Sequence, residues 1–221
     1  MARKLVTVTD SKSLISEQFR TMRTNIRFSM PNQDIKTLLV TSSIAGEGKS
    51  TNAANLGVVF AQEGKKVIII DTDMRKPTLH HTFSTLNSNG LSDVLTRQEI
   101  YFNVIQETTV EGLSIIPSGP LPPNPVELLS SKTMDILLQE LTKDFDIIIL
   151  DAPPLLSVSD AQILSNKCDG TLLVVNMDIV KKVDVLKAKT TLASSKAKTL
   201  GVVLNNIKIP KNHYFYQTYG S

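Results

Sequence analysis

The sequence predicts an α/β fold: a doubly wound, mainly parallel sheet with helices on both faces. Two segments, Ile68-Ile69-Ile70 and Ile147-Ile148-Ile149-Leu150, are continuously apolar, as is typical of parallel strands that are buried on both faces. Strand segments also alternate with segments of helical periodicity along most of the chain. The predicted strands lie at 37–42, 66–71, 113–117, 145–150, 171–176 and 200–205.

The helical periodicity predicts the elements that cover this sheet. Residues 1–13 are expected to be extended, and a loop rich in proline, 119–125, leads into a helix with Pro125 in its first turn. We see no internal repeat and expect one domain over 1–221, divided into an N-terminal segment (1–34), a nucleotide-binding core (35–208) and a flexible tail (209–221). The predicted helices are 14–30, 49–63, 125–142, 159–167 and 181–195, with a short one near 91–97.

Composition limits the classes of function. The chain has 24 Lys and Arg against 21 Asp and Glu, a net charge of +3, which is too mild to indicate nucleic-acid binding by itself. Cys168 is the single cysteine, so no disulfide can form within the chain, which fits a reducing compartment. No apolar run approaches the roughly 20 residues that cross a bilayer. We therefore expect a cytoplasmic protein that meets a membrane only through a partner.

The most informative segment is 42–51, which reads SSIAGEGKST between a predicted strand and a predicted helix. This is the context of a phosphate-binding loop. Gly46 and Gly48 allow a tight turn whose N–H groups surround a phosphate. Lys49 is expected to reach the outer phosphates, and the Ser50 hydroxyl to ligate Mg²⁺. Ser43 stands where this motif usually has a glycine. The predicted phosphate-binding residues are Ala45, Gly46, Glu47, Gly48, Lys49, Ser50 and Thr51.

Three acids follow predicted strands at the edge where this loop lies. Asp71 and Asp73 come after the second strand, and Asp151 ends the fourth. Ligands bind at the carboxyl edge of such sheets, and three carboxylates beside a triphosphate require a cation such as Mg²⁺. Ser50 and Asp151 are therefore expected to hold Mg²⁺. Either Asp71 or Asp73 is left to accept a proton from an attacking hydroxyl or water.

Other features admit two interpretations from the residues alone. Arg75 and Lys76 either steady transition-state charge or solvate their loop. Asn205 and Asn206 either contact adenine or cap a turn. On spacing alone, the charges at 17, 20 and 23 are a solvated helix face, and the tyrosines after Pro210 belong to an exposed, mobile tail. These last two groups are Glu17, Arg20 and Arg23, and Tyr214, Tyr216 and Tyr219.

Taken together, these motifs resemble those of the bacterial tyrosine kinases (BY-kinases) of capsule and exopolysaccharide synthesis. The resemblance covers essentially the whole chain. Residues 45–51 have the form of that family's first nucleotide motif, although Ala45 replaces a common proline. Residues 68–75 match its apolar-run-Asp-x-Asp-x-Arg motif, and 147–153 match its apolar-run-Asp-x-Pro motif. The resemblance implies a P-loop NTPase-like kinase that uses ATP and Mg²⁺.

The resemblance also assigns roles to individual residues. Asp71 is implied to be the base toward the tyrosine hydroxyl, with Lys49 on the phosphates and Asp73 and Asp151 on Mg²⁺. The helix with Glu17, Arg20 and Arg23 matches an oligomerisation motif. The terminal tyrosines are implied to be phosphorylated in trans within a ring. Family members of this short type act with a separate transmembrane adaptor, whose cytoplasmic tail activates them.

Two other classes of protein share parts of this pattern. Partitioning and cell-division ATPases have a similar phosphate loop, but they usually carry an additional lysine where this chain has Ile44, and they often end in an amphipathic helix. A nucleotide-binding regulator without catalysis is disfavoured by the intact set of Lys49 and the three aspartates. The kinase is therefore the first expectation, and the ATPase switch is the alternative.

Overall fold

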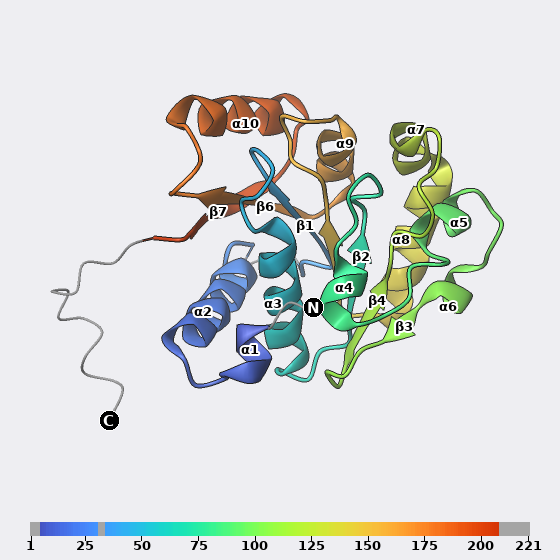
Figure 1. The fold of residues 1–221 in the computed structure, drawn as a ribbon, viewed down its shortest axis with the longest axis horizontal. Coiled ribbons are helices and arrows are strands. Elements are labelled where there is room, and N and C mark those ends of the chain that lie inside the picture. The colour runs from blue at the N-terminus through green and yellow to red at the C-terminus, as the bar shows by residue number, and fades with distance from the viewer. Residues whose placement is uncertain (1–4, 31–33, 208–221) are drawn as a thin grey trace, which may run out of the picture.

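The computed structural model describes residues 5–30 and 34–207 of the chain. A seven-stranded sheet forms the centre, in the order β3-β4-β2-β5-β1-β6-β7 (Figure 1). All neighbouring pairs are parallel except β3 and β4. The strands are β1 (Thr37–Ser42), β2 (Val67–Asp71), β3 (Gln106–Glu107), β4 (Leu113–Ile116), β5 (Ile147–Asp151), β6 (Gly170–Asn176) and β7 (Thr199–Asn205).

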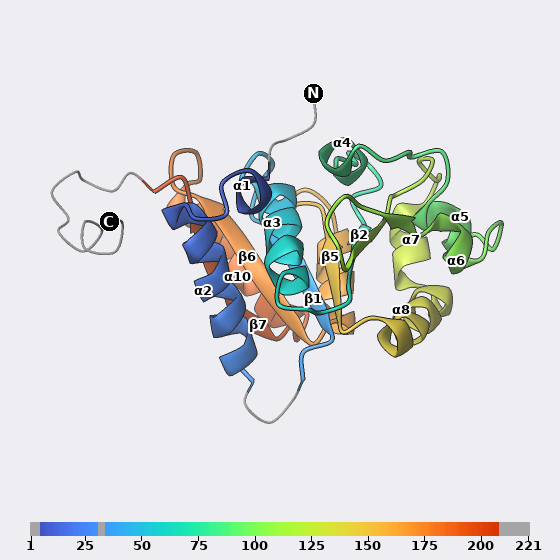
Figure 2. The same cartoon turned by 90° about the horizontal axis from the view of Figure 1, so that it is seen from below.

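Helices cover both faces of this sheet, as the sequence predicts. Figures 1 and 2 show α2 and α3 on one face and α8, α9 and α10 on the other. The first layer consists of α1 (Val6–Thr9), α2 (Leu14–Phe28), α3 (Lys49–Ala61) and α4 (Leu79–Phe83). The second consists of α5 (Leu91–Leu95), α6 (Tyr101–Val104), α7 (Pro125–Ser130), α8 (Lys132–Asp144), α9 (Asp160–Lys167) and α10 (Lys182–Ser194).

The continuously apolar strands supply both of the resulting cores. Ile69 of β2 packs into the core beneath α2 and α3, whereas Ile68 and Ile70 pack into the core beneath α8 and α9. All three side chains are completely buried. Each β2 residue from Val67 to Ile70 therefore contributes an apolar side chain to one layer or the other, which explains why this strand lacks the alternation of a half-exposed one.

Two expectations about helices were wrong. Residues 1–13 are not simply extended, because α1 forms within them and is fixed to α3: the Thr7 N–H and hydroxyl both donate to Asn55 Oδ1, at 3.1 and 2.8 Å. The single helix predicted over 125–142 is two helices. Ser131 has an extended backbone and its hydroxyl caps α8 by accepting from the Met134 N–H, as serine at such a position commonly does.

The sequence does not predict the short elements α4, α6 and β3, which have five, four and two residues. In the part of the chain that the structure describes, no helix is both long and apolar enough to cross a membrane.

Candidate functional site

The glycine-bearing turn joins β1 to α3 as predicted. Gly46 and Gly48 have φ of 85° and 92°, in the left-handed region that favours glycine. Gly48 is the N-cap of α3, and a Cβ there would lie 2.4 Å from Asn205 Nδ2. Ser43 has no positive φ, so the usual glycine is not required by the backbone at that position.

A buried carboxylate fixes this loop: the sequence places Glu47 among the phosphate-binding residues but does not predict this role for its side chain. Glu47 is 1% exposed. Its Oε2 accepts from the Ile44 N–H at 2.8 Å, and its Oε1 accepts from the Asn176 N–H at 3.0 Å. Asn205 Nδ2 donates to the Glu47 carbonyl at 2.9 Å. The loop is therefore attached to the ends of both β6 and β7, and Asn205 serves the loop in this structure instead of standing free for a base.

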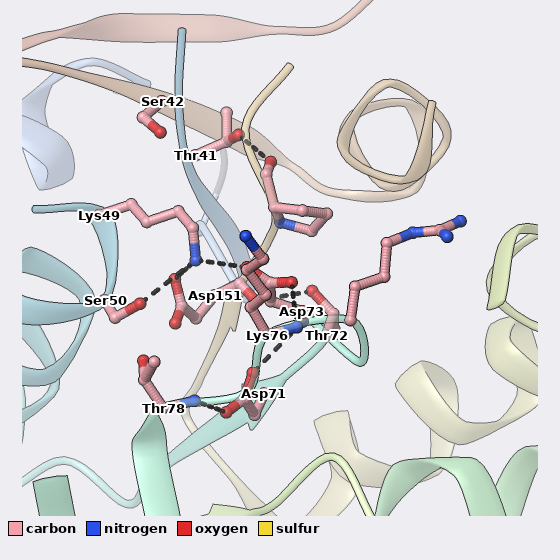
Figure 3. Close-up of polar contacts among 12 residues, drawn as sticks. Thr41, Ser42, Lys49, Ser50, Asp71, Thr72, Asp73, Lys76, Thr78 and Asp151 are labelled. Carbon is pink, nitrogen blue, oxygen red and sulfur yellow. Dashed lines mark hydrogen bonds and ion pairs between the residues drawn. The ribbon is translucent and has the colours of Figure 1, made fainter. Parts of the chain in front are cut away.

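Lys49 reaches the three-acid cluster from the start of α3. Its Nζ lies 2.9 Å from Asp73 Oδ2, 3.5 Å from Asp151 Oδ1 and 3.3 Å from Ser50 Oγ. Figure 3 shows Lys49, Asp73 and Asp151 pointing toward one another. Burial lowers the pKa of Lys49, but the charges of Asp151 and Asp73 outweigh it, so that the net pKa is raised. Lys49 is thus held as a cation at the position where the sequence predicts that the outer phosphates bind.

Asp71 ends β2 directly opposite Asp151 in the register of β2 and β5. Burial, followed by the charge of Asp151, raises the pKa of Asp71 to about 8. Its Oδ2 accepts from the Thr78 and Leu79 N–H groups, both at 3.0 Å, while its Oδ1 accepts only a 3.3 Å bond from the Asp73 N–H. These hydrogen-bond donors favour the ionised carboxylate and so lower the pKa of Asp71, but burial raises it by more.

Asp151 is the other completely buried acid of the site. Burial raises its pKa, and the charge of Lys49 opposes that shift. Its Oδ2 has no hydrogen-bond partner among the described residues. A buried carboxylate oxygen without a partner is expensive, and a hard cation or its water shell would satisfy it.

The donor set fits Mg²⁺ that arrives with phosphates. Within residues 5–30 and 34–207, no group of three or more His, Cys, Asp or Glu is arranged to hold a metal by itself. Mg²⁺ typically takes one or two carboxylates and completes its octahedron with phosphate oxygens and water. Ser50, Asp73 and Asp151 supply such a partial set beside the loop.

Arg75 makes a contact that neither of its two sequence interpretations includes. Its Nε lies 3.2 Å from Asp160 Oδ2 and one terminal nitrogen lies 3.4 Å from Oδ1. Asp160 is completely buried in the first turn of α9. The guanidinium therefore neutralises a buried acid and ties the loop after β2 to α9, a contact that spacing in the sequence does not reveal.

The predicted oligomerisation residues do not share one environment. Arg20 forms an ion pair with Glu17 and donates to the Ser11 carbonyl at 2.7 Å. Arg23 instead faces the same chain's α3: it donates to the Val59 carbonyl at 2.6 Å, and its Nε lies 3.6 Å from Glu63. Tyr214, Tyr216 and Tyr219 lie outside the described residues.

Comparison with known proteins decides the family. Residues 35–181 match the family described as AAA domain. The chain is 47% identical to tyrosine-protein kinase YwqD of Bacillus subtilis (strain 168) over 221 residues, which cover all of this chain and 93% of that protein. The chain belongs to the bacterial tyrosine kinases.

Solved structures of this kinase family have the same fold. The chimerical protein CapA2B2 superposes with a TM-score of 0.90 at 40% identity, over 95% of this chain and 93% of that one. The kinase domain of the Escherichia coli tyrosine kinase ETK gives 0.89 at 30% identity, over 100% and 86%. These matches confirm the P-loop NTPase-like α/β fold and the tyrosine-kinase resemblance.

The alternative class is also visible among the structural neighbours. The cell-division ATPase MinD of Pyrococcus furiosus gives a TM-score of 0.65 at 26% identity, over 76% of this chain and 71% of that one. The likeness is weaker in score, identity and coverage than that to the kinases. The kinase interpretation is therefore favoured over the ATPase switch.

Proposed function

We propose that this chain is an ATP- and Mg²⁺-dependent protein-tyrosine kinase that phosphorylates its own terminal tyrosines in trans and regulates the synthesis and export of capsular or exopolysaccharide. The observation that carries this proposal is the position of Lys49 between Asp73 and Asp151 at the mouth of the glycine loop. Family membership supplies tyrosine as the acceptor. The whole chain, 1–221, acts as one kinase domain in this proposal.

The loop and Lys49 bind and orient the nucleotide. The backbone of 45–51 surrounds the phosphates, with the positive end of α3 behind it. When ATP binds, the Lys49 ammonium group exchanges its carboxylate partners for the γ-phosphate. It then neutralises charge that develops on the transferred phosphoryl group. Glu47 and Asn205 keep the loop in place for this step.

Bound with ATP, Mg²⁺ would neutralise the charge of the phosphates. Ser50, Asp73 and Asp151 are the residues that would hold it. Asp73 accepts from Lys49 in the structure described here, so this carboxylate becomes available when the lysine moves to phosphate.

Asp71 is the residue that we assign to proton transfer. A tyrosine hydroxyl has a pKa of roughly 10, and a positioned carboxylate accepts its proton as the bond to phosphorus forms. The O–H bond breaks, the proton passes to Asp71, and ADP leaves with the bridging oxygen. Oδ1 of Asp71 is the oxygen suited to this role, because its single bond is long while Oδ2 accepts two shorter ones.

The acceptors are Tyr214, Tyr216 and Tyr219 of a neighbouring copy, in a ring to which Glu17, Arg20 and Arg23 contribute. In this proposal the kinase is cytoplasmic and is recruited to the inner face of the plasma membrane by the cytoplasmic tail of a transmembrane adaptor. Other protein tyrosines are its further substrates. The name of the CapA2B2 chimera, a structural neighbour, is consistent with a two-component arrangement.

The proposal is tested by incubating the pure protein with Mg-ATP, with and without a candidate adaptor tail, and reading phosphotyrosine by blot and mass spectrometry. Lys49→Met should abolish labelling, whereas Lys65→Met, an exposed lysine beyond the end of α3, should label normally. Persistent labelling of pure Lys49→Met protein would count against the assignment.

A further inference from the structure

A large groove lies between α2 and the outer edge of the sheet, and Thr51 and Asn205 line it where it approaches the phosphate loop. Its volume is about 1430 Å³, and residues of α1, α2, α3, β6 and β7 line it. Leu14 and Met22 line it from α2, and Leu172 and Val203 from the strands. Among the described residues that line it, Glu17 alone is charged. The groove therefore suits a neutral segment of chain with aromatic or aliphatic side chains.

The groove opens at an unpaired strand edge. Within the described residues, β7 is the last strand of the sheet and pairs only with β6. Val203 pairs with Val174 and packs toward the α2 face, while Val202 pairs with Leu173, whose side chain lies in the opposite core. Val202 and Leu204 are each 51% exposed. A seven-residue edge strand with four apolar side chains is a site for strand addition unless something covers it.

The chain itself carries a segment suited to this edge. Ile207 lines the groove, and residues 208–221 follow it directly. They span up to about 46 Å when extended, against roughly 23 Å for β7, so that a turn and a returning strand both fit. Pro210 suits the turn. His213-Tyr214-Phe215-Tyr216-Gln217 combines strong strand formers with alternating faces.

We infer that residues 211–219 dock in cis as an added antiparallel strand on β7, with the side chains of one face in the groove beneath α2. The tether makes this segment the favoured occupant, because a short linker gives an effective concentration in the millimolar range. Tyr214 and Tyr216 fall on one face of the added strand and Phe215 on the other. The edge offers apolar contacts on both faces, through Val203 on one and Val202 and Leu204 on the other.

Docking has a consequence that rests on the proposed kinase function. A docked tyrosine is withheld from a neighbour's active site. Phosphorylation adds about 1.5 to 2 negative charges, and the described lining residues include the carboxylate of Glu17 but no Lys or Arg to pair with those charges. A phosphorylated tail is therefore released and does not return until it is dephosphorylated.

Hydrogen exchange read by mass spectrometry tests docking without any kinase activity. The full chain is treated with phosphatase, kept in EDTA without nucleotide, and diluted until light scattering reports a monomer. We expect the amides of 211–219 to exchange at least ~10-fold more slowly than in a synthetic peptide of residues 208–221. Val202→Glu and, separately, Leu204→Glu should return them to the rate of the peptide. Ile136→Glu, a 47% exposed position on α8, is the matched control and should keep the protection.

Each outcome decides a part of the inference. Exchange of the wild-type tail at the rate of the free peptide overturns docking. Protection that exists only above the concentration at which the chain associates assigns the groove to a second copy's tail and overturns the cis arrangement. Tyr216→Glu introduces a negative charge without phosphorylation and should remove protection; if the tail stays protected, release by charge is wrong. Failure of the kinase assay changes none of these measurements.

Discussion

Lys49 Nζ lies 2.9 Å from Asp73 Oδ2, so the lysine that should bind phosphate is paired with an acid of its own site. A nucleotide must replace Asp73 as the partner of Lys49, and without a cation its phosphates also face Asp71 and Asp151. Binding of nucleotide and binding of Mg²⁺ are therefore expected to be linked through Asp73.

Asp73→Asn should reduce this linkage. Removing one negative charge should strengthen ADP binding in EDTA and reduce the increase in ADP affinity that Mg²⁺ produces. The ratio of the ADP affinity with Mg²⁺ to the ADP affinity in EDTA should therefore fall ~10-fold, or about 1.4 kcal/mol. Titration calorimetry with and without Mg²⁺ measures both values. Asp10→Asn, an exposed acid, is the control. An unchanged ratio in Asp73→Asn would remove Asp73 from the metal site.

The pKa of Asp71, raised by burial to about 8, predicts how stability depends on pH. The folded protein holds this proton more tightly than the unfolded chain, whose carboxyl has a pKa near 3.8. The contribution to stability is therefore complete below pH 3.8 and is lost as the pH rises through 8. Between pH 5 and 8, wild type should lose about 1 kcal/mol per pH unit relative to Asp71→Asn.

Urea denaturation at pH 5, 6.5 and 8, in EDTA without nucleotide, checks this slope. Asparagine retains an oxygen for the Thr78 and Leu79 N–H groups, so both proteins should fold. Parallel stability curves for the two proteins would mean that burial does not raise the pKa of Asp71 in the folded protein and that Asp71 is ionised throughout this range.

The sequence predicted features that depend on local pattern. Gly46 and Gly48 indicated the turn, and the continuous apolar runs indicated a sheet buried on both faces. The features that the sequence did not predict have a different physical origin. The break at Ser131 was hidden because apolar residues at helical spacing occur on both sides of it. The roles of Glu47 and Asp160 depend on partners far away in the sequence. An acid between two glycines was the only available signal for Glu47.

The ion pair between Arg75 and Asp160 predicts a structural effect of mutation. Arg75→Ala leaves a completely buried carboxylate without its cation, and the free energy of unfolding should fall by roughly 2 kcal/mol. Asp160→Asn in the same protein should recover part of this loss, since no buried charge then remains. Urea denaturation of the two single variants and the double variant measures the coupling. Additive losses would show that the pair is not coupled.

The two arginines of α2 should behave differently. Arg23 donates to the Val59 carbonyl at the end of α3 and has a side chain only 17% exposed, so Arg23→Ala should lower the melting temperature by several degrees. Arg20 pairs with the exposed side chain of Glu17, and such a pair contributes little to stability. Arg20→Ala should therefore alter the oligomer seen by light scattering while melting stays within a degree or two. If both variants lower the melting temperature equally, the two arginines do not have these different roles.

Replacing Tyr214, Tyr216 and Tyr219 with Phe should remove most self-phosphorylation and leave ADP affinity unchanged. The remaining tyrosine, Tyr101, packs against the core beneath α8 and stacks on Phe102 with ring centroids 4.1 Å apart, and burial raises the pKa of its hydroxyl. Tyr101→Phe is therefore the matched control and should retain labelling. Mass spectrometry of phosphopeptides after incubation with Mg-ATP separates these cases. If the triple variant is labelled as strongly as wild type, the acceptor lies outside the tail. Docking of the tail on β7 would then not compete with phosphorylation in trans.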